Sequence, residues 1–137
     1  MRRHMILALA VTLLLLATGA QAAEFTPSLV LGDFDWVVTG PPVIHDGAYA
    51  IYDVWPTVPG VDTADLHVVM VKWATIEPGR GSFPFGQYRT FLPFRPIGAG
   101  PLQLSCSIVA YRSYLDYWGR DRYDWYFGIM LVDVLVV

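Results

Sequence analysis

The segment from Tyr114 to Phe127 concentrates most of the side chains that this sequence can use for recognition or chemistry. It reads YLDYWGRDRYDWYF, so three carboxylates and two guanidinium groups lie among aromatic rings. Rigid rings supply contact area at little cost in side-chain entropy, and Arg supplies directed hydrogen bonds. The pattern predicts a surface that binds a protein or a carbohydrate, made by Tyr117, Trp118, Arg120, Arg122, Tyr123 and Trp125. The alternative is that alternate rings continue into the core as strand residues.

The carboxylates of the same segment support a second hypothesis, a Ca²⁺ site. Asp116, Asp121 and Asp124 would supply oxygen ligands, of which Ca²⁺ takes about 6–8. The alternative is that these side chains pair with Arg120 and Arg122 on a solvated loop. Exposed pairs of this kind contribute about 0–1 kcal/mol each.

A longer pattern surrounds these carboxylates. A strand ending in Val109-Ala110-Tyr111 precedes the Asp-bearing loop, and Asp124-Trp125-Tyr126-Phe127-Gly128 then leads into the apolar strand Ile129–Val134. These residues, about thirty in all, resemble the end of C2-like calcium-binding β-sandwiches. The resemblance implies Ca²⁺ ligation by the same three aspartates. The chain departs from the family at Tyr111 and Arg112, where an acidic residue is usual, and in the two arginines of the loop.

Other reactive side chains are scattered. Asp33 and Asp35 are expected on one face of a strand. They could form the solvent-exposed face of an edge strand, or they could bind a metal ion. His45 opens a His-Asp-Gly turn. A Cys–His nucleophile would need Cys106 to meet His45 or His67 in an accessible, electropositive setting, but the apolar neighbours of Cys106 predict a packed thiol. The mature chain contains no Gly-x-Ser-x-Gly, His-Glu-x-x-His, P-loop or Cys-x-x-Cys motif, which favours a non-catalytic role.

The elements that must position these residues are β-strands. Runs of β-branched and aromatic residues alternate with dense Pro and Gly, which helices would not survive. The expected strands are Leu29–Thr39, Ala48–Trp55, Leu66–Ile76, Gln87–Phe94, Leu102–Tyr114 and Trp125–Val136. The sequence therefore predicts an all-β fold, a six- to seven-stranded antiparallel β-sandwich of the immunoglobulin-like or C2-like kind.

Two of these strands are apolar on both faces. Leu66–Ile76 is expected to be a central strand covered on both sides, with Trp73 as the anchor of the core. The run Phe127–Val137 is interrupted only by Asp133, so something must cover it. An exposed apolar edge invites strand pairing, which gives a further hypothesis: an assembly subunit that pairs through its C-terminal strand.

The N-terminus has the three parts of a secretory signal. Arg2 and Arg3 precede an apolar stretch, and Ala20-Gln21-Ala22 fits a cleavage site. The apolar stretch falls short of the ~20 residues that a spanning helix needs, so no stable membrane insertion is expected. We therefore expect residues 1–22 to be a cleaved signal peptide, and residues 23–137 to be one extracytoplasmic domain, periplasmic or secreted.

Charge and cysteine content narrow the partners. Without Arg2 and Arg3, seven basic residues face twelve acidic ones, a net charge of about −5, which disfavours a nucleic-acid partner. Cys106 is the single cysteine, so no internal disulfide stabilises the fold. The sequence thus predicts an exported, non-catalytic module that binds a glycan or an envelope protein. No cofactor is expected unless the Ca²⁺ hypothesis holds.

Overall fold

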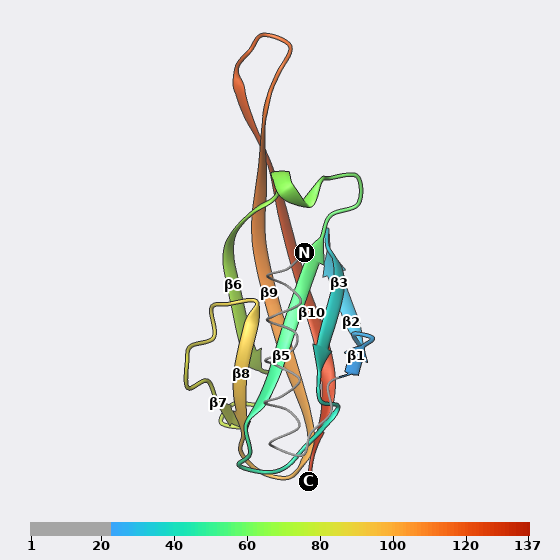
Figure 1. Ribbon diagram of the computed structural model, residues 1–137, viewed down its shortest axis with the longest axis vertical. Coiled ribbons are helices and arrows are strands. Elements are labelled where there is room, and N and C mark those ends of the chain that lie inside the picture. Colours follow the sequence, from blue (N-terminus) through green and yellow to red (C-terminus); the bar gives the residue numbers. More distant parts are fainter. Residues whose placement is uncertain (1–22) are drawn as a thin grey trace, which may run out of the picture.

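Two β-sheets lie face to face in the computed structural model, which describes residues 23–137 (Figure 1). In spatial order the first sheet contains β1 (Ala23–Phe25), β3 (Asp35–Gly40), β5 (Ala50–Thr57), β8 (Phe91–Pro96) and β7 (Gly81–Ser82). The second contains β2 (Leu29–Gly32), β10 (Asp121–Val136), β9 (Gly100–Leu115) and β6 (His67–Thr75), with β4 (Val43–Ile44) beside the end of β10. A short 3₁₀ helix, Thr63–Asp65, connects β5 with β6. The predicted all-β sandwich is confirmed.

The core lies between the sheets and is rich in large rings. Trp73, expected to anchor the core, is fully buried. The rings of Tyr52 and Phe94 pack edge to face with centroids 6.4 Å apart. The hydroxyl of Tyr52 donates to the carbonyl oxygen of Pro41 at 2.8 Å, and burial raises the pKa of this phenol. Packing of this kind replaces the disulfide that the chain lacks.

The longest strand pairing among the described residues joins β9 to β10. The two strands are antiparallel and stay in one register from Gly100↔Val136 to Leu115↔Asp121. Their inward side chains, every second residue, are buried within the sandwich: Leu102, Leu104, Cys106, Ile108 and Ala110 of β9, and Met130, Val132, Val134 and Val136 of β10. The alternation read from the sequence of β9 is confirmed, and the terminal apolar run is covered by the first sheet on one face.

The expected strand Leu29–Thr39 is divided between the two sheets. β2 ends at Gly32, which has a φ of +98°, and a Cβ there would collide with the carbonyl oxygen of Phe127. The chain then crosses through Phe34, only 2% exposed, to start β3 in the opposite sheet. β2 itself has no buried residue, whereas β3 buries Val38, so the run of apolar residues does not reveal where the chain changes sheets.

The expectation for Leu66–Ile76 was right about the strand and wrong about its place. β6 lies at the edge of the second sheet, and its outward residues Val69 and Met70 are about half exposed. A β-bulge interrupts the pairing with β9 between Val68 and Met70. Apolar residues on both faces of a strand therefore did not indicate a central position here.

The expected strand Gln87–Phe94 begins later, at Phe91. The residues before it pair with Trp73 instead of extending β8. The backbone N–H of Trp73 donates to the carbonyl oxygen of Gln87 at 2.9 Å, and its indole Nε1 to that of Arg89 at 2.7 Å. This loop thus closes part of the open edge of β6.

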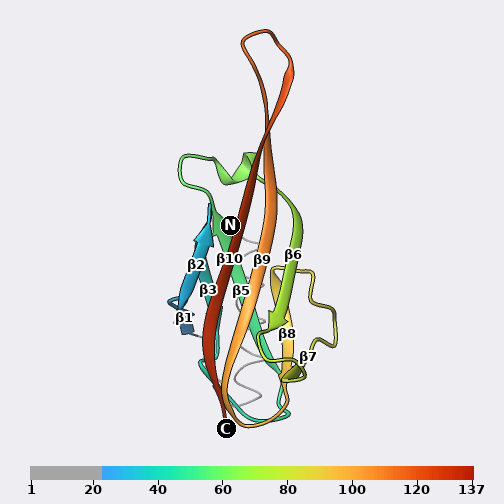
Figure 2. The same ribbon diagram turned by 180° about the vertical axis from the view of Figure 1, so that it is seen from behind.

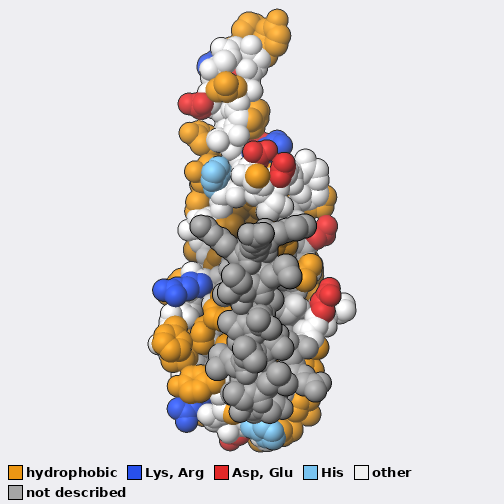
Figure 3. All heavy atoms as spheres, viewed as in Figure 1, with side chains coloured by type: hydrophobic (Ala, Val, Ile, Leu, Met, Phe, Trp, Pro, Cys, Tyr) orange, Lys and Arg blue, Asp and Glu red, His pale blue; other side chains and the backbone are white. Residues whose placement is uncertain are grey.

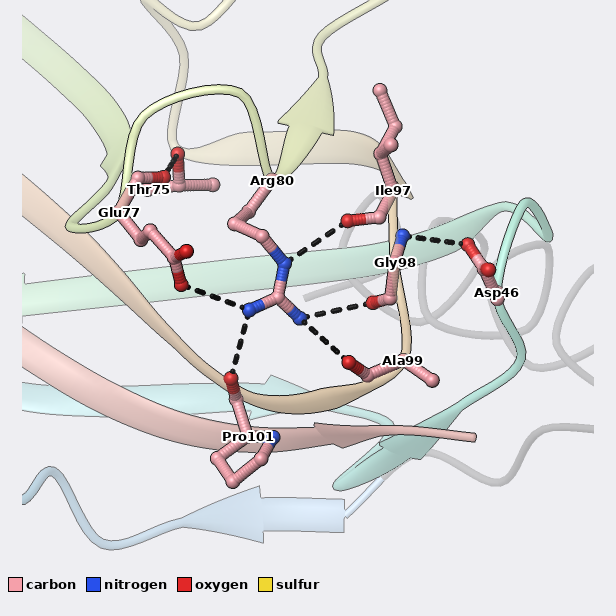
Figure 4. A network of polar contacts seen from close by, with 8 residues as sticks. All are labelled: Asp46, Thr75, Glu77, Arg80, Ile97, Gly98, Ala99 and Pro101. Carbon is pink, nitrogen blue, oxygen red and sulfur yellow. Dashed lines mark hydrogen bonds and ion pairs between the residues drawn. The ribbon is translucent and has the colours of Figure 1, made fainter.

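Arg80 holds together the end of the sandwich opposite the β9–β10 turn (Figure 4). Its guanidinium donates at 2.9–3.5 Å to the carbonyl oxygens of Ile97, Gly98, Ala99 and Pro101. Glu77 completes the set at 3.0 Å, and Asp46 accepts from the N–H of Gly98 at 2.8 Å. The planar fork of Arg spreads five N–H donors over three nitrogens and so reaches all of these carbonyls, whereas the ammonium of Lys has three donors on one nitrogen.

The described residues include no helix long and apolar enough to cross a membrane. The expected signal peptide, residues 1–22, lies outside the described part of the chain.

We expect Arg80→Lys to lower the free energy of unfolding by about 1–3 kcal/mol, because the carbonyl groups around a largely covered guanidinium lose charged donors. Urea unfolding followed by tryptophan fluorescence measures the change. Glu77→Gln is the matched control, since Glu77 is 70% exposed and a surface pair contributes less than about 1 kcal/mol. Equal losses in both variants would contradict the role given to the carbonyl contacts.

Candidate recognition hairpin

The predicted loop from Tyr114 to Phe127 is mostly strand. β9 runs to Leu115 and β10 starts at Asp121, so a short turn joins two long arms. β6 stops pairing with β9 at Tyr111, and β2 stops pairing with β10 at Gly128. Beyond these points the two arms continue alone and project from the sandwich (Figures 1 and 2). We call this projection, residues 111–128, the hairpin.

The turn is organised by Asp116. One carboxylate oxygen accepts from the backbone N–H groups of Trp118 and Arg120, both at 2.9 Å. The other accepts from Nε of Arg120 at 3.2 Å and from Nε of Arg122 at 3.1 Å. The Arg120 backbone bond, followed by the bond from Arg122, holds the pKa of this carboxyl below its ordinary value. Gly119, with a φ of +73°, supplies the left-handed residue that the turn requires.

The three aspartates of the calcium hypothesis do not converge. Asp124 faces Arg112 across the ladder and binds it at 2.7 Å. Asp121 lies on the opposite face of β10 from Asp124, at an odd position rather than an even one. Within residues 23–137, no group of three or more His, Cys, Asp or Glu is placed to hold a metal ion. The alternative, carboxylates paired with arginines, describes Asp116 and Asp124.

The four aromatic residues of the predicted binding surface are exposed, whereas Tyr126 of the same hairpin packs against the core. Tyr117 and Trp118 at the turn are 91% and 72% exposed, with ring centroids 4.9 Å apart and nearly perpendicular planes. Figure 3 shows hydrophobic side chains at the far end of the projection. Tyr123 and Trp125 are 56% and 52% exposed. The alternative, that these rings continue into the core, does not apply to any of the four.

Arg120 and Arg122 add positive charge beside these rings. Their side chains are 61% and 52% exposed while both bind Asp116. The structure therefore brings the predicted binding residues together on one hairpin, distributed between its turn and its β10 arm.

Sequence reasoning missed how far the aromatic face extends. Tyr111 packs against Trp125 and Tyr123 at centroid distances of 5.3 and 5.7 Å, and His67 stacks on Tyr111 at 5.0 Å. Phe127 continues the row and is 58% exposed. The period-two pattern of β9 contained the signal for Tyr111. His67 comes from β6, so only the strand pairing places it here.

A shallow depression of about 340 Å³ lies next to this row, on the face of the second sheet that points away from the core. Its lining comprises Leu31, Gly32, Ser107, Ile108, Val109, Phe127, Gly128 and Ile129. The lining offers apolar contact and a single hydroxyl, so it is suited to an apolar side chain rather than to chemistry.

The remaining candidates have structural roles. Asp33 accepts from the N–H of Phe127 at 2.9 Å and so fastens the end of β2 to β10, whereas Asp35 begins β3. His45 lies in a turn closed by its own carbonyl group, as expected. Cys106 is fully buried, and burial raises the pKa of its thiol to about 12. The prediction of a packed thiol is confirmed.

Comparisons with models of protein families, with curated proteins and with solved structures found no match. A functional proposal therefore has to rest on the geometry of the hairpin.

We expect the turn to depend on the ionised form of Asp116. Because its pKa is lowered in the folded chain, the stabilisation is complete above pH ~4, the ordinary pKa of Asp, and is lost as the pH falls through the lowered value. Asp116→Asn should increase amide hydrogen exchange at Trp118 and Arg120 already at pH 7. Asp121→Asn is the matched control. Equal effects of the two substitutions would contradict the assignment.

We expect millimolar Ca²⁺ or a chelator to leave the melting temperature unchanged, because the hairpin carboxylates are apart and Asp116 is saturated with donors. Differential scanning calorimetry measures this. A rise with Ca²⁺ that Asp116→Asn abolishes would support the calcium hypothesis.

Proposed function

We propose that this protein is an exported, non-catalytic binding module that recognises its partner through the hairpin. The observation that carries the proposal is the pair Tyr117 and Trp118, 91% and 72% exposed at the end of a projection. Side chains of this size are ordinarily covered, since each can bury ~150–250 Å². Their exposure away from the body supports a site that becomes covered on binding.

The turn that carries these rings is stiff. Asp116 binds backbone and side chains around it, and the two rings brace each other at 4.9 Å. A prearranged site loses less conformational entropy on binding than a flexible loop does. Aromatic and Arg side chains of this kind are the usual energetic anchors of interfaces.

The partner that this shape fits best is a protein. A convex tip with two rings at its end complements a concave pocket, and Arg120 with Asp121 provides a polar rim beside the rings. If residues 1–22 are a secretory signal as expected, the partner is a protein of the cell envelope or the exterior. Stacking of the same rings on a sugar is the second candidate, favoured by the exposed indole of Trp118.

The experiment is a binding screen of the exported protein against a glycan array and a panel of purified envelope proteins. For any ligand found, we expect Trp118→Ala to weaken binding about tenfold or more, because the indole is the largest exposed ring of the turn. Surface plasmon resonance measures the ratio of Kd values.

Tyr88→Ala is the matched control, because Tyr88 is 66% exposed but lies outside the hairpin. Its Kd should equal that of the wild type. A ligand that loses affinity with Tyr88→Ala and not with Trp118→Ala would place recognition elsewhere and overturn the proposal. Binding to glycans alone would select the second candidate.

A further inference from the structure

One edge of β10 is left without a neighbouring strand in the hairpin. β2 pairs with this edge from Gly128 to Leu131, and β4 pairs with it at Leu135 and Val136. From Asp121 to Tyr126, no strand among the described residues pairs with it. An open edge of this length presents N–H and C=O groups that can pair with another chain.

The direction of these groups follows from the strand's alternation. Phe127 donates its N–H to Asp33 at 2.9 Å and accepts from the N–H of Asp33 at 2.8 Å, so both of its main-chain groups point away from β9. The register with β9 has no irregularity in β10. The main-chain groups of Asp121, Tyr123 and Trp125 therefore point the same way, outward from the hairpin.

We propose that this edge binds the same edge of a second copy of the chain, antiparallel and centred on Tyr123, to form a two-fold symmetric dimer. Tyr123 then faces Tyr123 of the second copy, and Asp121 faces Trp125. Residues facing each other in these pairs exchange both N–H···O bonds, because all of them carry outward groups. The two hairpins become one continuous four-stranded sheet, an isologous contact.

The charges along this edge select the register. With Tyr123 at the centre, Arg122 stands opposite Asp124 of the second copy, and the symmetry repeats the pair. Both side chains are accessible, at 52% and 38% exposure. Centring the pairing on Arg122 instead would set two like charges directly opposite each other, which is destabilising. When the strand is paired antiparallel with a copy of itself, opposite charges face each other. This favours a second copy of the chain over an unrelated peptide.

The side chains of Arg122 and Asp124 both retain hydrogen-bonding groups that can make this new contact. Arg122 uses Nε for Asp116, and its guanidinium has five N–H donors in all. Asp124 binds Arg112 through Oδ2, and a carboxylate has two acceptor oxygens. The same register brings Arg120 of the second copy next to Asp33, where β2 ends, which adds a further attraction between opposite charges.

The sequence predicts strand pairing at the C-terminal end of β10, whereas this dimer pairs through the other end of the same strand. Towards the end of β10, Leu131 pairs with β2, and Leu135 and Val137 donate their N–H groups to the carbonyl oxygens of Pro42 and Ile44. This end therefore offers fewer open main-chain groups than the hairpin does. The opposite end of the same strand offers the open edge. The dimer goes beyond the proposed function, since neither Tyr117 nor Trp118 takes part in it.

The test is analytical ultracentrifugation of the exported protein and two charge variants. We expect the wild type to dimerise, and Arg122→Asp and Asp124→Arg each to raise the dimer Kd about tenfold or more, because like charges then face each other. An equal mixture of the two variants should form a heterodimer with nearly wild-type Kd, since every facing pair is again opposite in charge. This rescue separates the interface from local effects on Asp116 and Arg112.

Proline substitutions test the backbone pairing independently. Tyr123→Pro removes an outward N–H without breaking a bond between β9 and β10, so the dimer should be lost while circular dichroism stays unchanged. Ser113→Pro is the matched control, since Ser113 faces Tyr123 in the ladder and its N–H points to the other edge. This variant should still dimerise.

Trp118→Ala should keep the dimer, which distinguishes failure of this inference from failure of the proposed function. A wild type that sediments as a monomer up to ~1 mM, far above a micromolar Kd, would overturn the inference. A dimer that survives both charge variants and Tyr123→Pro would overturn it as well, because its interface would lie elsewhere.

Discussion

The ladder between β9 and β10 is the constraint on which the rest of the structure depends. It keeps one register from Gly100↔Val136 to Leu115↔Asp121, so every residue along it alternates between two faces without a slip. In the sandwich this alternation sends Leu104 and Met130 into the core. Outside the sandwich the same alternation sends Tyr123 and Trp125 to one face of the hairpin, with Arg112 and Asp124 on the other. One hydrogen-bond pattern therefore serves both a buried and a solvated environment.

Close backbone contacts mark the place where the β9–β10 ladder leaves the sandwich and becomes the solvated hairpin. A Cβ on Gly128 would collide with the ring of Phe34, and one on Gly32 would collide with the backbone of β10. Where β2 leaves the sheet, the carboxylate of Asp33 accepts a hydrogen bond from the backbone N–H of Phe127. The second sheet can thus narrow to two strands without leaving the main-chain groups of Phe127 unpaired, which would be costly next to the core.

The hairpin beyond this point has no core to stabilise it, and polar contacts perform that task. Asp116 accepts hydrogen bonds from the backbone of the turn. An ion pair between Nη2 of Arg112 and Oδ2 of Asp124, 2.7 Å apart, joins the two arms. The two aromatic rings at the end of the hairpin remain exposed. Among residues 23–137, Cys106 is buried, and no group of three or more His, Cys, Asp or Glu is placed to hold a metal ion. The hairpin presents exposed aromatic area to its surroundings.

The sequence by itself determined the all-β class, the alternation of β9, the burial of Trp73 and Cys106, and the segment in which exposed rings gather. These features follow from local periodicity and composition, which the chain carries residue by residue. The tertiary structure alone decided that Leu29–Thr39 splits between two sheets, that β6 lies at an edge, and that Asp116 and Asp124 bind arginines instead of converging. Each of these depends on which strand lies beside which, and strands far apart in sequence leave no local signal of their pairing. The open edge of β10 follows for the same reason, since it exists only because β2 ends at Gly32 while β10 continues.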